Sequence, residues 1–133
     1  MSTDHKTVLV IDDEADEREQ MRRTLQRESY TVLEAADYKD ALALHHRHKG
    51  EIDLVLIDLA LPGGSGYELS LAMLAAEPRL RVLFISGHSG AEAVKFFPAP
   101  VQDVHFLKKP FNGHELLRRV KAVMEAAPLS GTA

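Results

Sequence analysis

The chain has no cysteine and no tryptophan among its 133 residues. The absence of cysteine excludes a disulfide-stabilised fold, a thiolate zinc site, an iron–sulfur cluster and a cysteine nucleophile. No stretch approaches the roughly 18 consecutive apolar residues of a membrane-spanning helix, and the N-terminal Met-Ser-Thr-Asp-His-Lys lacks the apolar core of a signal peptide. We therefore expect a cytoplasmic protein without membrane contacts.

Positive charge is sparse and scattered. Sixteen Lys and Arg residues against 20 Asp and Glu residues give a formal net charge of -4. Without a basic stripe, direct binding to nucleic acid is not expected. The length fits a single domain, since domains typically have roughly 100–200 residues. We expect this domain over residues 1–127 and a flexible tail over residues 128–133, whose sequence is Pro-Leu-Ser-Gly-Thr-Ala. The initial Met and this tail favour a short stand-alone protein.

Short apolar runs recur along the chain and predict strands. Residues 8–11, 54–57 and 82–85 are continuously apolar, which is typical of strands buried on both faces of a parallel sheet. Residues 31–35 alternate with polar side chains, and residues 104–107 are interrupted by a histidine. These two segments are predicted to be edge strands.

Helical patterns separate the predicted strands, over residues 14–28, 38–48, 66–77, 91–97 and 115–127. Asp37 and Asn112 are the predicted N-caps of the second and the last of these helices, and Pro98 keeps the fourth helix short. Alternation of strands and helices predicts an α/β protein with a doubly wound parallel sheet. In such sheets ligands bind at the carboxyl ends of the strands.

Polar residues cluster at these carboxyl ends. Those after the predicted strands are Asp12, Asp13, Asp58, Ser86, Lys108 and Lys109, and Gly87 follows Ser86 directly. Clustered carboxylates repel one another, so they require a divalent cation or raised pKa values. Mg2+ binds through a few carboxylates with carbonyl, water and phosphate oxygens. An ammonium and a hydroxyl facing it suit a transferred phosphoryl group, which a carboxylate can itself accept.

Four motifs carry a family resemblance. They are Val-Leu-Val-Ile-Asp-Asp-Glu at residues 8–14, Asp-Leu-Val-Leu-Ile-Asp-Leu-Ala-Leu-Pro-Gly-Gly-Ser-Gly at 53–66, Val-Leu-Phe-Ile-Ser-Gly at 82–87 and Phe-Leu-Lys-Lys-Pro-Phe at 106–111. In this order and at this spacing the chain resembles the receiver domain of two-component response regulators. The resemblance implies a five-stranded flavodoxin-like (βα)5 fold with strand order 2-1-3-4-5. It also implies a phosphoacceptor switch rather than a classical enzyme, with a histidine kinase or a histidine phosphotransfer protein as partner.

The resemblance implies a role for each carboxylate of this edge. Asp58 is the phosphoacceptor. Asp12, Asp13 and Asp58 hold Mg2+ together with the backbone carbonyl of Ala60. The backbone of Ala60 also contacts the phosphoryl group.

Further roles follow from the same resemblance. Ser86 and the backbone N–H of Gly87 bind the phosphoryl oxygens, and Lys109 neutralises their charge. Phe106 turns inward as Ser86 moves, which makes the pair a switch. The resemblance also implies a cis peptide bond between Lys109 and Pro110.

Two features depart from the family pattern. Pro98 and Pro100 predict a shortened fourth helix, a layout that resembles receivers of hybrid histidine kinases. Glu17, Gln20 and Thr24 lie on the first helix at positions where relatives often carry apolar residues. This polar face indicates either a changed partner preference or simply a well-solvated helix.

Several alternatives stay open. The chain is either a phosphoacceptor or a degenerate receiver that only binds a partner. A haloacid-dehalogenase-like phosphohydrolase is disfavoured, because Ala60 stands where such enzymes carry a second Asp. His45, His46 and His48 are predicted to form a solvated helix end rather than a metal site. The Gly-Gly-Ser-Gly segment at residues 63–66 predicts a flexible turn, since no Gly-Lys-Ser/Thr follows it as in a P-loop.

Overall fold

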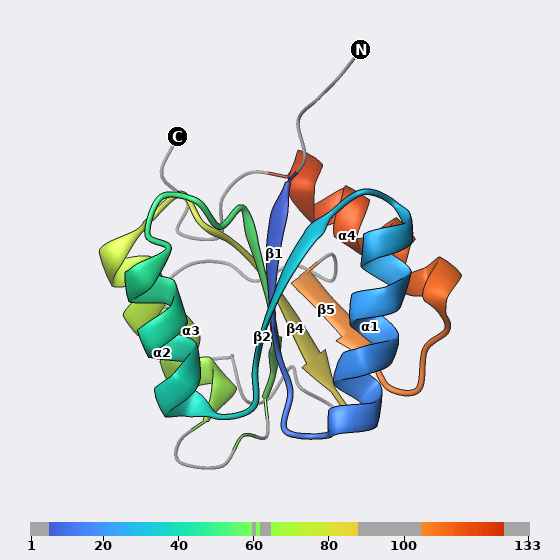
Figure 1. Cartoon of the computed structure of the whole chain (residues 1–133), viewed down its shortest axis with the longest axis horizontal. Coiled ribbons are helices and arrows are strands. Elements are labelled where there is room, and N and C mark those ends of the chain that lie inside the picture. The colour runs from blue at the N-terminus through green and yellow to red at the C-terminus, as the bar shows by residue number, and fades with distance from the viewer. Residues whose placement is uncertain (1–5, 60, 62–64, 88–104, 127–133) are drawn as a thin grey trace.

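The computed structural model describes residues 6–59, 61, 65–87 and 105–126. A parallel sheet with strand order β2-β1-β3-β4-β5 forms its centre (Figure 1). The strands are β1 (Thr7–Ile11), β2 (Thr31–Ala35), β3 (Leu54–Asp58), β4 (Arg81–Ser86) and β5 (Phe106–Lys108). The predicted α/β class, strand order and edge positions of the second and fifth strands are thereby confirmed.

Helices cover both faces of the sheet. They are α1 (Ala15–Arg27), α2 (Tyr38–Arg47), α3 (Gly66–Ala76) and α4 (Gly113–Glu125). Figure 1 shows α2 and α3 on one face and α1 and α4 on the other. Within the described ranges, no helix combines the length and apolar composition needed to cross a bilayer. The helix predicted over residues 91–97 and the tail predicted over residues 128–133 lie outside the described residues.

The three central strands explain the continuously apolar runs of the sequence. Leu9 and Ile11 of β1 pack into the core under α2 and α3, whereas Val8 and Val10 pack into the core under α1 and α4. Successive residues therefore face opposite apolar layers, so the interior positions of the central strands are apolar and polar residues stand only at the strand ends. The edge strands lack this requirement, which accounts for their mixed sequences.

Local capping sets the starts of two helices. The Asp37 side chain accepts a hydrogen bond from the backbone N–H of Asp40 at 2.8 Å, as expected for the predicted N-cap of α2. Asn112 and Glu115 form a reciprocal capping box, with distances of 2.8 and 2.9 Å. Because Asn112 is the cap itself, α4 starts at Gly113, earlier than predicted. The strand predicted over residues 104–107 is also shifted, since β5 is Phe106–Lys108.

The histidines of α2 differ from the prediction in one respect. His46 is exposed and His48 pairs with Glu51 at 3.0 Å, but His45 is buried. Its Nε2 lies 2.6 Å from Oε1 of Glu77, at the end of α3. The predicted solvated helix end is therefore wrong for His45, because the packing of α2 beside α3 covers this side chain.

Candidate functional site

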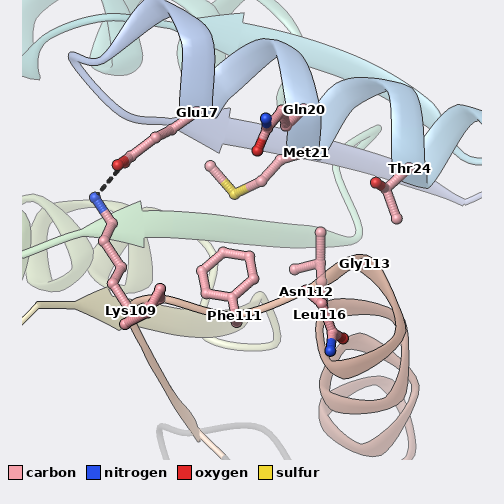
Figure 2. Close-up of a pocket in the computed structure, with 10 residues that line it drawn as sticks. Glu17, Gln20, Met21, Thr24, Lys109, Phe111, Asn112, Gly113 and Leu116 are labelled. Carbon is pink, nitrogen blue, oxygen red and sulfur yellow. Dashed lines mark hydrogen bonds and ion pairs between the residues drawn. The ribbon is translucent and has the colours of Figure 1, made fainter.

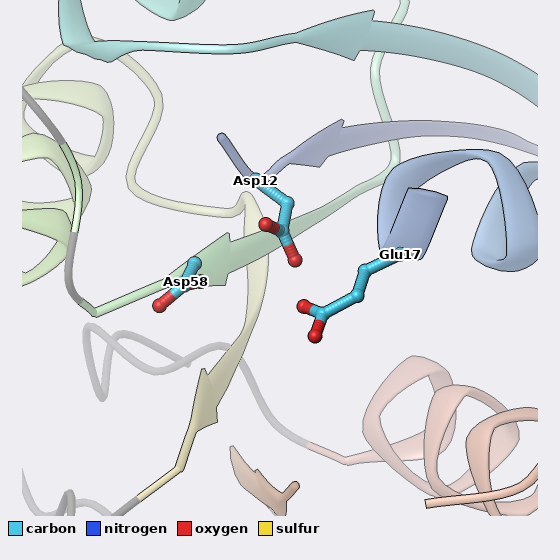
Figure 3. Close-up of side chains that lie close together, drawn as sticks. All are labelled: Asp12, Glu17 and Asp58. Carbon is cyan, nitrogen blue, oxygen red and sulfur yellow. The ribbon is translucent and has the colours of Figure 1, made fainter. Parts of the chain in front are cut away.

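Three carboxylates meet at the carboxyl edge of the sheet. Asp12 follows β1, Asp58 ends β3, and Glu17 projects from the first turns of α1 toward them (Figure 3). One oxygen of each lies within 4.8 Å of the others. Asp12 and Asp58 are buried, while the Glu17 side chain is 46% exposed. The turn into α1 is held by the backbone N–H of Glu14, which donates to Oδ1 of Asp12 at 2.8 Å.

The ammonium of Lys109 lies among these carboxylates. Its Nζ is 2.6 Å from Glu17 Oε1, 3.0 Å from Asp58 Oδ2 and 3.5 Å from Asp12 Oδ2. Burial by itself lowers the pKa of Lys109, but the hydrogen bonds to Glu17 and Asp58 and the charge of Asp12 outweigh it and raise that pKa above its ordinary value. The lysine is therefore a permanent cation at neutral pH.

The backbone around Lys109 directs its side chain to this edge. The N–H of Lys109 donates to the carbonyl of Ser86 at 2.8 Å. The peptide bond between Lys109 and Pro110 is cis. The hydrogen bond to Ser86 places Lys109 beside the end of β4.

Asp12 is the least satisfied group of the cluster. Its side chain is fully buried, and Oδ2 has no hydrogen-bond partner within the part of the chain that the structure describes. Burial raises the pKa of Asp12 from 3.8 to about 6, opposed by the Glu14 N–H bond and the charge of Lys109 and assisted by the charges of Asp58 and Glu17. A buried carboxylate oxygen without a donor, beside other acidic oxygens, fits a hard divalent cation.

A neighbouring ion-pair network fixes α1 against the sheet. Arg18 donates from its guanidinium to the backbone carbonyl of Asp12 at 2.7 Å. Arg18 and Arg22 also pair with Glu34 of β2, at 3.1 and 2.9 Å. These contacts hold the first turns of α1, and with them Glu17, at the acidic edge.

Gly66 at the start of α3 lies directly against the backbone of Asp58. A Cβ at this position would come within 2.3 Å of the Asp58 carbonyl oxygen and 2.9 Å of the Leu59 Cα. The N–H of Gly66 donates to the carbonyl of Leu59 at 3.1 Å. The flexible turn predicted over residues 63–66 therefore ends in a tightly packed glycine, and residues 62–64 lie outside the described residues.

The remaining predicted site residues are placed as follows. Ser86 is half-buried at the end of β4 and Gly87 is exposed. Phe106 is half-buried on β5, with its ring centroid 5.6 Å from that of Phe84. Asp13 is exposed and is not part of the acidic group formed by Asp12, Glu17 and Asp58. Ala60 lies outside the described residues.

A cavity of about 240 Å³ opens beside this edge, between α1 and the start of α4 (Figure 2). Met21, Phe111 and Leu116 contribute apolar surface to its wall, while Glu17 and Lys109 border it near the acidic cluster. Gln20 and Thr24 also line it. The polar face predicted for the first helix therefore borders a cavity next to the candidate site.

Glu17 is a site residue that the sequence pattern alone does not identify. A signal was present, since Glu17 follows Asp12 closely enough to lie in the first turns of a helix that starts at the same edge. The helical pattern alone did not say which face of the helix would turn toward the strands. That orientation depends on packing of Met21 and Leu25 against the sheet.

Comparisons with known proteins agree with this geometry. The family model described as the response regulator receiver domain matches residues 8–121. Sensor kinase CckA of Brucella abortus is 34% identical over 119 residues, which are 90% of this chain and 12% of CckA. The phosphate regulon transcriptional regulatory protein PhoB of Pseudomonas aeruginosa is 35% identical over 120 residues, which are 90% of this chain and 52% of PhoB.

Among solved structures, a chain of the CheX–CheY–BeF3–Mg2+ complex of Borrelia burgdorferi has a TM-score of 0.80 and 25% identity, covering 91% of this chain and 90% of that chain. The curated relatives named above are much longer, so this chain corresponds to one part of each of them. The matched residues 8–121 contain Asp12, Asp58 and Lys109 and nearly all of the described sheet and helices. The chain belongs to the response regulator receiver domain family.

Proposed function

We propose that this receiver domain is a phosphoacceptor switch of a two-component system or phosphorelay. Asp58 takes a phosphoryl group from a phosphohistidine of a histidine kinase or a histidine phosphotransfer protein. The change is read out through contacts with another protein. The observation that carries this proposal is the convergence of Asp58, the ammonium of Lys109 and the buried Asp12, whose Oδ2 has no hydrogen-bond partner among the described residues.

The transfer needs little covalent chemistry from the protein. A carboxylate oxygen of Asp58 forms a bond to phosphorus while the phosphorus–nitrogen bond of the donor breaks. The electron pair of that bond stays on the imidazole nitrogen, which leaves as the free base. Lys109, 3.0 Å from Asp58 Oδ2, neutralises charge on the transferred oxygens. Catalysis therefore rests on position and electrostatics.

The carboxylate donor set supports a requirement for Mg2+. Asp12 and Asp58 would hold the ion, together with the predicted ligands Asp13 and the backbone carbonyl of Ala60. When bound, Mg2+ would supply positive charge to the phosphoryl oxygens. The similar Borrelia burgdorferi complex contains BeF3 and Mg2+ by its title, which supports the same chemistry here.

The readout is proposed to run through Ser86 and Phe106. Phosphorylation adds roughly 1.5 to 2 negative charges at Asp58. Ser86 and the N–H groups of Gly87 and Ala60 would bind the new oxygens, and movement of Ser86 opens space into which Phe106 turns. This is a shift between two packings of one fold. No movement of the Phe106 ring signals in NMR spectra with beryllofluoride would contradict it.

Intact-protein mass spectrometry after incubation with acetyl phosphate and Mg2+ tests the proposal. We expect a gain of about 80 Da, the mass of one phosphoryl group, that is lost with a chelator and in Asp58→Asn. Asp53→Asn is the matched control, because Asp53 accepts from the N–H of Thr7 at the opposite end of the sheet. No mass gain together with no beryllofluoride binding by NMR would leave the partner-binding module as the better function.

A further inference from the structure

Glu17 makes the shortest contact to the site lysine. Its Oε1 lies 2.6 Å from Lys109 Nζ, compared with 3.0 Å for Asp58 Oδ2 and 3.5 Å for Asp12 Oδ2. Glu17 is also the most accessible of the three, with a side chain that is 46% exposed against 8% and 0% for Asp58 and Asp12. The most solvated carboxylate of the cluster thus holds its ammonium most closely.

We propose that Glu17 is a positioning residue for Lys109, an inference that rests on the proposed function of Asp58. Glu17 provides the ammonium with a second binding position at the outer rim of the site. A divalent cation can then replace the ammonium between Asp12 and Asp58. Conversely, Lys109 has to leave Glu17 before it can neutralise an incoming phosphoryl group.

The effect on cation binding follows from competition for the same oxygens. An ammonium has three N–H donors, and the Nζ of Lys109 lies within 3.5 Å of an oxygen of each of the three carboxylates. Without the Glu17 carboxylate, its remaining carboxylate partners in the cluster are Asp12 and Asp58, the groups that the cation needs. Loss of Glu17 also removes a negative charge that lies within 4.8 Å of both. Both consequences weaken cation binding.

Loss of Glu17 should accelerate phosphoryl transfer, although it weakens cation binding. The phosphoryl donor is an anion, and the charge of Glu17 repels it at the rim through which it approaches. Glu17 also retains Lys109 in an ion pair that has to be broken before the lysine can turn to the phosphoryl oxygens. Removal of Glu17 should therefore accelerate the step once the cation site is saturated. Replacement of a residue that only stabilised α1 would not weaken Mg2+ binding and at the same time accelerate phosphorylation.

The test compares Glu17→Gln and Glu17→Asp with the wild-type chain. Glu17→Gln removes the charge, while Glu17→Asp keeps the charge but shortens the reach to Lys109. Glu19→Gln is the matched control, because Glu19 lies on the same helix and pairs with Arg23 at 2.6 Å. Two quantities are measured: the Mg2+ dissociation constant from amide shifts in NMR titrations, and the rate of phosphorylation by acetyl phosphate at saturating Mg2+.

For Glu17→Gln we expect a Mg2+ dissociation constant about 3- to 10-fold higher and a phosphorylation rate about 3- to 10-fold higher, as for one nearby charge in a partly solvated site. Glu17→Asp should show a smaller rate increase and a smaller loss of affinity, because it keeps the charge at the rim but shortens the reach to Lys109. Glu19→Gln should match the wild-type chain in both measurements.

The outcomes separate this inference from the proposed function. If wild-type protein is phosphorylated at Asp58 and Glu17→Gln leaves both quantities unchanged, or lowers both affinity and rate, Glu17 does not position Lys109. Wild-type behaviour of Glu17→Asp in both measurements would assign the effect to charge alone and would also overturn the inference. Failure of the wild-type chain to accept a phosphoryl group would instead count against the proposed function, while the Mg2+ titration still reports on Glu17.

Discussion

Lys109 lies closer to Glu17 than to Asp58, with Nζ–oxygen distances of 2.6 and 3.0 Å. The lysine thereby connects the end of β5 to the first turns of α1 and to the end of β3. β3 and β5 are strands of the sheet, and α1 is tied to β2 by the ion pairs of Arg18 and Arg22 with Glu34. In the unmodified site, a cation or a phosphoryl group that contacts Asp58 therefore has to rearrange the ion pairs of Lys109.

Replacement of Lys109 should strengthen cation binding but slow phosphoryl transfer. In Lys109→Met the competing ammonium is gone, so we expect several-fold tighter Mg2+ binding by NMR titration. The phosphorylation rate with acetyl phosphate should fall by about 100- to 1000-fold, the usual effect of losing a charge-stabilising group. Lys108→Met is the matched control, since Lys108 is exposed and precedes Lys109 directly. Weaker Mg2+ binding in Lys109→Met would show that the two cations do not compete.

Neutralisation of Asp12 should stabilise the metal-free protein. Burial raises the pKa of Asp12 from 3.8 to about 6, so between these values the folded state binds more protons than the unfolded state. Stability contributed by this group therefore falls as pH rises through that window and stays low above it. We expect Asp12→Asn to increase the free energy of unfolding at pH 7 by about 1–3 kcal/mol, given about 1.4 kcal/mol for each pKa unit.

Urea denaturation at pH 4 and pH 7 without divalent cations measures this effect. The gain should largely disappear at pH 4, where Asp12 of the folded wild-type chain is protonated. The amide oxygen of Asn can still accept the Glu14 N–H bond. Asp13→Asn is the control, because Asp13 is exposed. Destabilisation of Asp12→Asn at pH 7 would mean that the Lys109 ion pair outweighs the burial of the charge.

A side chain at position 66 should disturb the acceptor strand. In Gly66→Ala the new Cβ would meet the Asp58 carbonyl oxygen at 2.3 Å, and backbone atoms cannot move away as a side-chain end can. We expect a loss of about 1–3 kcal/mol in the free energy of unfolding, as for overpacked sites, and slower phosphorylation. Gly87→Ala serves as the stability control, since its Cβ would meet nothing within 4 Å. Equal unfolding midpoints in urea would refute the close approach.

Loss of His45 should lower the free energy of unfolding, because this side chain is buried where α2 packs beside α3. His45→Ala removes the 2.6 Å contact to Glu77 and leaves a void at a buried position. The carboxylate keeps its bond from the backbone N–H of Gly50 at 3.1 Å. We expect a loss of about 1–3 kcal/mol in urea denaturation, while the exposed His46→Ala should stay near the wild-type value. Similar stability of both variants would place His45 outside the packed interior.

Much of the fold was predictable from local patterns. The continuously apolar runs that form β1, β3 and β4 indicated strands buried on both faces, and Asp37 and Asn112 marked helix starts by their capping chemistry. Because parallel strands end at one edge, the sequence also indicated that polar residues after them would meet there. Asp12, Asp58 and Lys109 lie together in the structure for this reason.

The tertiary structure decided what depends on how elements pack. The rotation of α1 about its axis brings Glu17 to Lys109, the approach of α3 to β3 leaves no space for a Cβ at Gly66, and the packing of α2 beside α3 buries His45. None of these contacts has a local signature, because each depends on the position of a second element distant in sequence. The sequence by itself determined which strand-end residues reach the carboxyl edge, because parallel strands end together; packing of α1 against the sheet determined that Glu17 joins them and holds the lysine.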